Sequence, residues 1–205
     1  MARVLILFAH PSLERSRVHR VLLDALPSDP GLTLHDLYEA YPRLDIDVAR
    51  EQELLLGHDV IAFQHPFYWY STPPILKQWQ DLVLEHGWAY GSTGDALEGK
   101  TFLSILSAGG GEAAYCAVGY NRFTVRQLLA PVEQTAQLCG MRFLPPFVVF
   151  GTHRLGPSDI AAQAARYRAL VEALVAGEPD EAERERLADA ITINGFVDRL
   201  VGAGT

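Results

Sequence analysis

Apolar residues along the chain fall into five short runs that are separated by stretches with helical spacing. The runs cover residues 3–9, 32–37, 59–64, 101–107 and 147–150. The first run is apolar almost throughout, which is typical of a strand buried on both faces of a sheet. Five such runs alternating with helices predict a parallel sheet covered by helices on both faces.

Helical periodicity predicts the segments between and after these runs. We expect helices over residues 17–26, 48–56, 73–83, 123–139 and 160–174, and a helical acidic tail over 180–201. Pro131 should kink or split the fourth of these, and the tail should break near Gly195. Pro73 and Pro74 suit the first turn of their helix, where proline is tolerated.

The fold class predicted from this pattern is α/β, a flavodoxin-like three-layer sandwich. Right-handed crossovers restrict the topology, and five strands favour the order 2-1-3-4-5. In that order the ligand crevice lies at the carboxyl ends of the strands, beside strand 1. We expect one domain over residues 1–177, followed by a C-terminal helical extension over 178–205.

Composition excludes several other classes. The chain has 205 residues, of which 49% are hydrophobic and 20% charged, so a folded domain is expected rather than disorder. Its formal net charge of -8 opposes binding to nucleic acid. The apolar run near the N-terminus is too short to span a membrane. Cys116 and Cys139 lack a CxxC spacing, so we expect reduced thiols and a cytoplasmic protein.

The segment after the first strand is a candidate anion site. It contains His10, Ser16 and Arg17, and Ser16 is a good N-cap for the helix predicted to follow. Free backbone N–H groups and the helix dipole would attract a phosphate such as that of FMN. The alternative is an ordinary loop with a capped helix.

The segment after the third strand carries four consecutive aromatic residues, Phe67 to Tyr70. A core strand would alternate, and a surface loop would not usually expose such a group. An isoalloxazine ring needs apolar walls together with backbone N–H groups, and this loop could supply both. The alternative is a dimer interface.

The segment after the fourth strand contains Gly109, Gly110 and Gly111. Glycines let the backbone approach a ligand closely and turn its N–H groups toward negative charge. Because parallel strands end at one rim of the sheet, we expect this turn beside the aromatic loop.

Other motifs carry little weight. Residues 94–101 match the phosphate-binding pattern GxxxxGK[ST], but they precede a strand instead of following one, so we reject nucleotide-triphosphate binding. The seven histidines show no metal-ligand spacing, and no metal site is predicted. The GxSxG elbow of hydrolases is missing from the sequence.

Four strings of the sequence resemble a known family. They are AHPSLERSRVHR, QHPFYWYSTPPILKQWQDLVLEHGWAYG, AGGGE and CGMRFLPPFVVF. They resemble the NAD(P)H:quinone oxidoreductases with a flavodoxin-like fold. Within that family the likeness is greatest to the FMN-binding ancillary subunits of bacterial glutathione-regulated potassium-efflux systems. The likeness covers about residues 3–175.

The resemblance implies an FMN-binding domain over residues 1–177 and NADPH or NADH as electron donor, with FAD less favoured. It also implies a homodimer, with ping-pong hydride transfer to a quinone-type acceptor. The FMN contacts that it implies are His10, Ser16, Arg17, Val18, His19, Phe67, Tyr68, Trp69, Tyr70, Ala108, Gly109, Gly110 and Gly111.

Two positions depart from the family pattern. Relatives often have threonine where this chain has Ala108. Larger quinone reductases place a tyrosine and a histidine beyond the glycines, and here the matching positions are Tyr115 and Asn121. In those enzymes the pair is thought to relay charge and protons during hydride transfer, and asparagine cannot take up a proton. Either Tyr120 or water supplies the proton in this chain, or the enzyme is slow. We therefore expect Tyr115, Tyr120 and Asn121 in the catalytic region.

Two other functions fit the same sequence. The chain could be a regulatory subunit attached to a membrane potassium/proton antiporter, at the inner face of the cell membrane. It could also be an azo- or nitro-reductase, which differs only in the acceptor.

Overall fold

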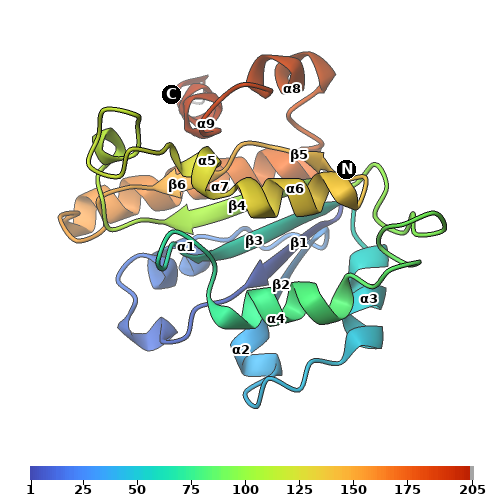
Figure 1. Cartoon of the computed structure of the whole chain (residues 1–205). Coiled ribbons are helices and arrows are strands. Elements are labelled where there is room, and N and C mark those ends of the chain that lie inside the picture. The colour runs from blue at the N-terminus through green and yellow to red at the C-terminus, as the bar shows by residue number, and fades with distance from the viewer. Residues whose placement is uncertain (204–205) are drawn as a thin grey trace.

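A parallel sheet lies at the centre of the protein, whose computed structural model describes residues 1–203 (Figure 1). Its strands follow the order β2-β1-β3-β4-β5, which confirms the predicted topology. The first four are β1 (Val4–Phe8), β2 (Leu32–Asp36), β3 (Val60–Pro66) and β4 (Thr101–Ser107). Each lies close to one of the predicted runs.

The fifth position of the sheet is shared by two short strands. Both β5 (Arg142–Phe143) and β6 (Phe147–Val149) pair with β4 in parallel. The predicted run over 147–150 corresponds to β6, whereas β5 was not expected. Pro145 and Pro146 lie between them, and because proline has no N–H to donate, a continuous strand is interrupted there.

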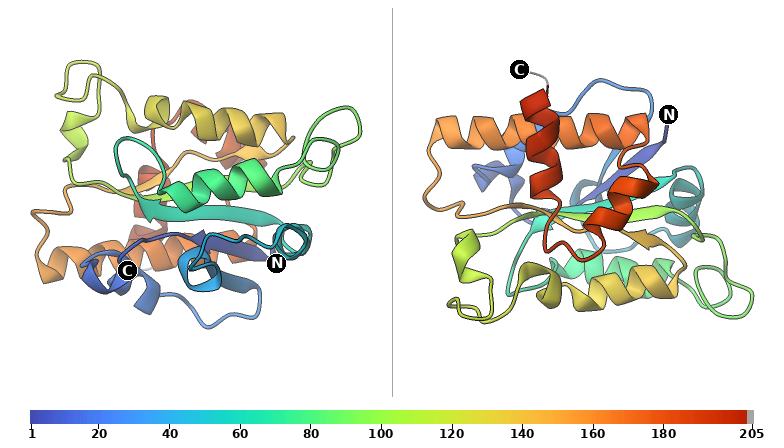
Figure 2. Two further views of the ribbon diagram at one scale, coloured as in Figure 1. Left: turned by 60° about the horizontal axis from the view of Figure 1, so that its bottom comes forward. Right: turned by 90° about the horizontal axis from the view of Figure 1, so that it is seen from above.

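Helices cover both faces of the sheet (Figure 2). One face carries α1 (His19–Asp24) and α7 (Pro157–Ala176). The other carries α3 (Val48–Leu56), α4 (Pro74–Val83) and α6 (Ala130–Leu138), with the short helices α2 (Leu37–Ala40) and α5 (Val125–Leu128). Two single 3-10 turns, η1 (Leu13–Arg15) and η2 (Glu112–Ala114), lie in the loops after β1 and β4. Separate apolar cores on the two faces hold the layers together.

The start of the first helix differs from the prediction, whereas the predicted split of the helix at Pro131 is confirmed. The first helix begins at His19, with Val18 as its N-cap, so Ser16 lies two residues before the capping position. Ser16 Oγ nevertheless accepts the His19 N–H at 3.1 Å, which is the kind of bond that a cap makes. Pro131 lies in the first turn of α6, and the break between α5 and α6 falls just before it, at Leu129.

The C-terminal extension forms α8 (Glu181–Leu187) and α9 (Asn194–Ala203). The predicted break near Gly195 is wrong by a few residues, because the chain leaves the helix over 188–193 and Gly195 lies inside α9. Residues 204–205 of the predicted extension lie outside the described residues.

The extension lies along the β6 edge of the sheet (Figure 2, right). Asn194 Oδ1 accepts the Val148 N–H at 3.0 Å, and Asn194 Nδ2 donates to the Val148 carbonyl at 2.8 Å. The Ile193 N–H donates to the Pro146 carbonyl at 3.0 Å. Ile193 and Val197 are fully buried. The extension therefore satisfies edge groups of β6 and adds to the core beneath α7.

Arg126 of α5 fastens the chain between α8 and α9. Its guanidinium donates to the carbonyls of Ala188 and Ala190 and forms an ion pair with Glu133 at 2.6 Å. This pair raises the pKa of Arg126, against the effect of burial. The extension is thus held from both faces of the sheet.

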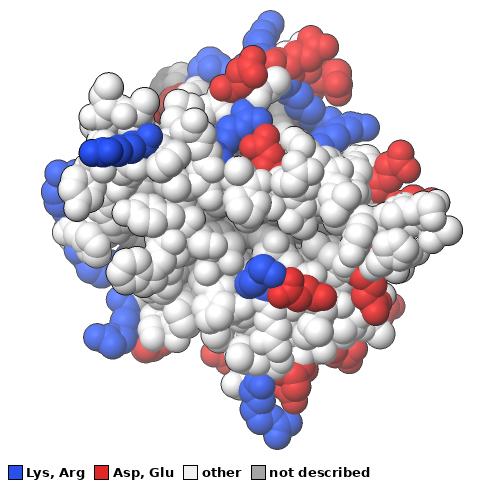
Figure 3. All heavy atoms as spheres, viewed as in Figure 1, with Lys and Arg blue, Asp and Glu red and all other residues white. Residues whose placement is uncertain are grey.

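Charge is unevenly distributed on the side that carries α4 and α6. Lys, Arg, Asp and Glu lie mainly around the outline in this view, and a broad uncharged area crosses it with a few charged side chains near its middle (Figure 3). Among residues 1–203 no helix is both long enough and apolar enough to cross a bilayer. Both cysteines are free thiols.

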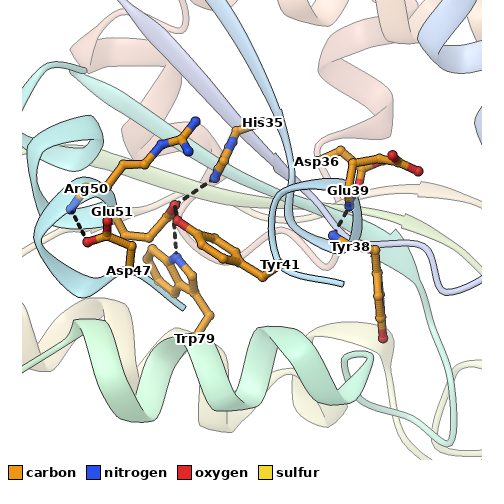
Figure 4. A network of polar contacts seen from close by, with 9 residues as sticks. All are labelled: His35, Asp36, Tyr38, Glu39, Tyr41, Asp47, Arg50, Glu51 and Trp79. Carbon is orange, nitrogen blue, oxygen red and sulfur yellow. Dashed lines mark hydrogen bonds and ion pairs between the residues drawn. The ribbon is translucent and has the colours of Figure 1, made fainter. Parts of the chain in front are cut away.

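A buried carboxylate joins α3 to α4 beneath this surface (Figure 4). Glu51 is fully buried and accepts hydrogen bonds from His35 Nε2 at 2.7 Å, Trp79 Nε1 at 2.8 Å and Tyr41 Oη at 2.5 Å. Burial alone would raise the pKa of Glu51, but these three donors lower it overall. The network holds α4 in position, and α4 directly follows the aromatic loop.

Candidate functional site

The carboxyl ends of β1, β3 and β4 meet around one open cavity of about 610 Å³. This volume is within the range of small-molecule and cofactor sites. The neighbourhoods of Ser16, Trp69 and Gly110 therefore lie together, as the strand order predicts. The cavity is lined by His10, Ser12, Arg15, Ser16, Arg17, Val18, Pro66, Phe67, Tyr68, Trp69, Tyr70, Ser107, Gly109, Tyr115, Thr152 and His153.

The loop after β1 supplies hydrogen-bond donors and positive charge. His10 Nδ1 accepts the Ser12 N–H at 3.1 Å, so the proton of the neutral imidazole is on Nε2. Burial lowers the pKa of His10, and the nearby Glu14 carboxylate opposes this. Arg17 donates to the Leu155 carbonyl at 2.6 Å, which ties this loop to the one after β6. Arg15 also lines the cavity.

The aromatic loop makes a tight turn in an unusual conformation. Trp69 and Tyr70 have φ angles of 50° and 63°, and the Ser71 N–H closes the turn on the Tyr68 carbonyl at 3.0 Å. This is the pattern of a type I′ turn, which normally takes asparagine and glycine. Within residues 1–203, the N–H groups of Trp69 and Tyr70 have no acceptor. Such strained positions recur at ligand sites.

The glycine turn after β4 packs against the loop that follows β6. A Cβ on Gly109 would lie 2.5 Å from His153 Nε2, and the Gly151 N–H donates to the Gly110 carbonyl at 2.9 Å. Of the four predicted contacts in this turn, Gly109 lines the cavity, whereas Ala108, Gly110 and Gly111 do not. The Ala108 N–H is taken up by the Val149 carbonyl.

The three predicted catalytic residues have different surroundings. Tyr115 is mostly buried and lines the cavity, and burial raises the pKa of its hydroxyl. Asn121 does not line the cavity; its Oδ1 accepts the Tyr70 hydroxyl proton at 3.2 Å. Tyr120 also lies outside the lining, with its side chain 91% exposed. In the single chain, Tyr120 is not in place to act on a ligand in the cavity.

His19 is likewise absent from the cavity wall and is fully buried. Its Nε2 lies 2.9 Å from Ser107 Oγ, which does line the cavity. Burial lowers the pKa of His19 well below its usual range, and the nearby His10 and His65 act in the same direction.

Six lining residues were not predicted: Ser12, Arg15, Pro66, Ser107, Thr152 and His153. A signal existed for all six of them, because the rule that strand ends carry the site applies to each. Pro66 ends β3 and Ser107 ends β4, whereas the others follow β1 (Ser12, Arg15) or β6 (Thr152, His153).

This fold and site define a class of protein. The family described as having a flavodoxin-like fold matches residues 2–174, and the chain belongs to this family of flavodoxin-like NAD(P)H oxidoreductases. The match ends before α8, so the extension lies outside the family region.

Three proteins with known names are similar to this chain in sequence or structure. The glutathione-regulated potassium-efflux system ancillary protein KefG of Pectobacterium atrosepticum is 44% identical over 165 residues, which are 80% of this chain and 90% of the relative. The general stress protein 14 of Treponema denticola, solved in complex with FMN, is 41% identical with a TM-score of 0.80, over 84% and 99% of the two chains. An NADPH-quinone reductase from P. pentosaceus is 34% identical with a TM-score of 0.74, over 82% and 96%.

Proposed function

We propose that the chain is an FMN-dependent NAD(P)H:quinone oxidoreductase that transfers two electrons in ping-pong fashion. The observation that carries this is the cavity itself, in which donors and cations, an aromatic wall and a glycine turn meet from three strand ends. The similarity to an FMN-bound protein and to an NADPH-quinone reductase supports it.

The residues present fit FMN. The loop after β1 offers Ser16, Arg15 and Arg17 for the phosphate. The aromatic loop offers a wall for the ring and the two unpaired N–H groups of Trp69 and Tyr70. Gly109 keeps the backbone open, since a Cβ there would collide with His153.

Bound FMN would supply the redox chemistry, taking a hydride from the nicotinamide and passing it to the quinone. The protein would position the reactants and exclude water from them. The raised pKa of Tyr115 keeps its hydroxyl protonated, so it can donate a hydrogen bond inside the cavity. Asn121 would hold Tyr70 through the bond to its hydroxyl.

The decisive experiment is an absorbance spectrum of the purified protein, with the released flavin identified by mass. We expect FMN, and oxidation of NADPH or NADH with a soluble quinone. Azo and nitro acceptors in the same assay would define the acceptor class. A colourless protein that neither binds added FMN nor oxidises NAD(P)H with quinone would end this proposal.

A homodimer would explain the exposed apolar residues near the cavity. Trp69 is 93% exposed, and Val118, Tyr120 and Phe123 are also exposed. Exposed apolar side chains of this size are typical of surfaces that meet another protein, and the face in Figure 3 also has a broad uncharged area. Such a partner could bring Tyr120 to the other copy's site. Analytical ultracentrifugation should then give twice the mass of one chain, and a monomer would contradict the dimer.

A regulatory role is the second candidate, because the KefG relative is named as an ancillary protein of a potassium-efflux system. In this role the protein docks on a membrane antiporter. Co-purification with the antiporter, and efflux that is lost on deletion but kept in a variant unable to bind flavin, would favour it over the enzymatic role.

A further inference from the structure

A continuous line of buried polar groups leads from the helix layer into the cavity. Tyr167 of α7 donates its hydroxyl proton to Gln64 Oε1 at 2.6 Å. Gln64 Nε2 lies 3.5 Å from His19 Nδ1, and His19 Nε2 lies 2.9 Å from Ser107 Oγ. Tyr167, Gln64 and His19 are all fully buried, and only Ser107 reaches the cavity. Four separate elements, α7, β3, α1 and β4, thus contribute one residue each.

The donors and acceptors along this line of hydrogen bonds can be assigned. Tyr167 uses the carbonyl oxygen of the Gln64 amide, so the amide nitrogen faces His19. An amide nitrogen can only donate, and His19 Nδ1 must therefore accept. The proton of the neutral imidazole is then on Nε2, which donates to Ser107 Oγ.

Among residues 1–203, no acceptor for the hydroxyl proton of Ser107 is then left. A serine hydroxyl has one proton to donate and two lone pairs to accept with. With one lone pair occupied by His19, the proton is free to point into the cavity. If His19 Nε2 were instead the acceptor, Ser107 would turn its proton away and offer only lone pairs.

We propose that His19, although sealed from the cavity, is a positioning residue that makes Ser107 a hydrogen-bond donor to an acceptor atom of the bound ligand. This inference rests on the proposed function in taking FMN as that ligand. The oxygen and nitrogen acceptors of FMN suit a donor, and they would be repelled by a serine that offers only lone pairs. The neutral state of His19 that its burial imposes is consistent with this assignment.

The first test is nuclear magnetic resonance of the flavin-free protein labelled with ¹⁵N-histidine. The His19 ring signals are identified by their loss in His19→Asn. We expect a neutral ring protonated on Nε2. A ring protonated on Nδ1 would overturn the proposal, and this result requires neither FMN nor a folded variant other than the one used for assignment.

The second test is a double-mutant cycle on FMN affinity. We expect Ser107→Ala to weaken FMN binding about tenfold, as for one lost hydrogen bond. His19→Asn should weaken it by a similar factor, and the double variant should be no weaker than either alone, because both remove the same donor. His58→Asn is the matched control, since His58 is a largely buried histidine bonded to Thr33 and the Leu54 carbonyl, away from the cavity.

The outcomes separate this inference from the proposed function. Losses that add in the double variant would show that His19 only supports the fold, and the inference would fail while FMN binding stands. If the wild-type protein bound no FMN, the proposed function would fail, and Ser107 would lose its ligand with it. The ¹⁵N measurement would then still show which ring nitrogen of His19 carries the proton.

Discussion

Single residues at or next to the cavity have strained backbone conformations or unpaired buried polar atoms, which a sequence selected for stability alone would avoid. Trp69 and Tyr70 hold left-handed backbone angles, each at a cost of about 1–3 kcal/mol. His65 is fully buried, donates from Nδ1 to the Pro66 carbonyl and has no partner at Nε2 within residues 1–203. The backbone strain and the unpaired buried nitrogen both occur at or just after the end of β3, which helps to form the site.

The strain at Trp69 can be separated from the role of its ring. Trp69→Gly should raise the free energy of unfolding by about 1 kcal/mol, because glycine adopts a positive φ freely and an indole 93% exposed gives up little packing. Trp69→Ala keeps the strain and should not gain this stability. Both variants should bind FMN more weakly in fluorescence titrations. Equal stability of the two variants would show that the turn is unstrained.

His65 makes stability depend on pH. Burial lowers its pKa from 6.5 to about 4, so between these values the unfolded chain binds a proton that the folded protein does not. The free energy of unfolding should therefore fall as pH drops from 6.5 toward 4, by up to about 1.4 kcal/mol per pH unit for one proton. His19 contributes with the same sign.

Urea unfolding between pH 4 and 7 checks this expectation. In His65→Asn the free energy of unfolding should change less steeply with pH than in the wild-type protein, by the equivalent of about one proton. The slope that remains is due in part to His19. An unchanged slope in His65→Asn would mean that His65 titrates alike in the folded and unfolded states.

At the scale of elements, the site depends on loops that fit against one another. The loop after β6 lies against the glycine turn after β4, and Arg17 joins it to the loop after β1. The conformation of each of these three loops therefore depends on its contacts with the other two.

Gly109→Ala tests the contact between these loops. The new Cβ would lie 2.5 Å from His153 Nε2 and displace the imidazole, which lines the cavity. We expect FMN affinity to fall about tenfold or more, with the free energy of unfolding changed by less than about 1 kcal/mol, because the ring can rotate toward solvent. Adding His153→Ala should restore part of the affinity. Full affinity in Gly109→Ala would contradict the close contact.

The sequence predicts those features that follow from period and chain order. The apolar runs over residues 3–9, 59–64 and 101–107 reveal β1, β3 and β4 to within two residues at their ends, and parallel pairing brings these ends together. The pattern cannot reveal β5, because two residues have no period. Nor can it show that His19 turns inward to meet Ser107, or that Tyr120 points to solvent, since both depend on packing between distant segments.

For the whole molecule, the extension beyond the family region is part of the folded body. It completes the core beneath α7 and covers the edge of the sheet at β6. Edge strands without such cover invite pairing with other chains.

Removing residues 178–205 should therefore lower the free energy of unfolding by several kcal/mol and promote association. The point variant Asn194→Ala should cost about 1–3 kcal/mol, since it leaves the Val148 N–H and carbonyl without their partner. Asn194→Asp should cost at least as much, because a carboxylate oxygen would face the Val148 carbonyl. Thermal unfolding and light scattering measure these effects. An unaltered melting temperature in both point variants would show that Asn194 does not support the edge.

The bond between Asn194 and Val148 also bears on how the protein could be recognised. A side-chain amide presents one donor and one acceptor with the spacing of a peptide group. Asn194 therefore pairs with β6 as a neighbouring strand would, but it does not continue the sheet. A peptide strand cannot pair with the β6 edge where the C-terminal extension already occupies it. A binding partner must therefore contact another surface of the protein or first displace the extension.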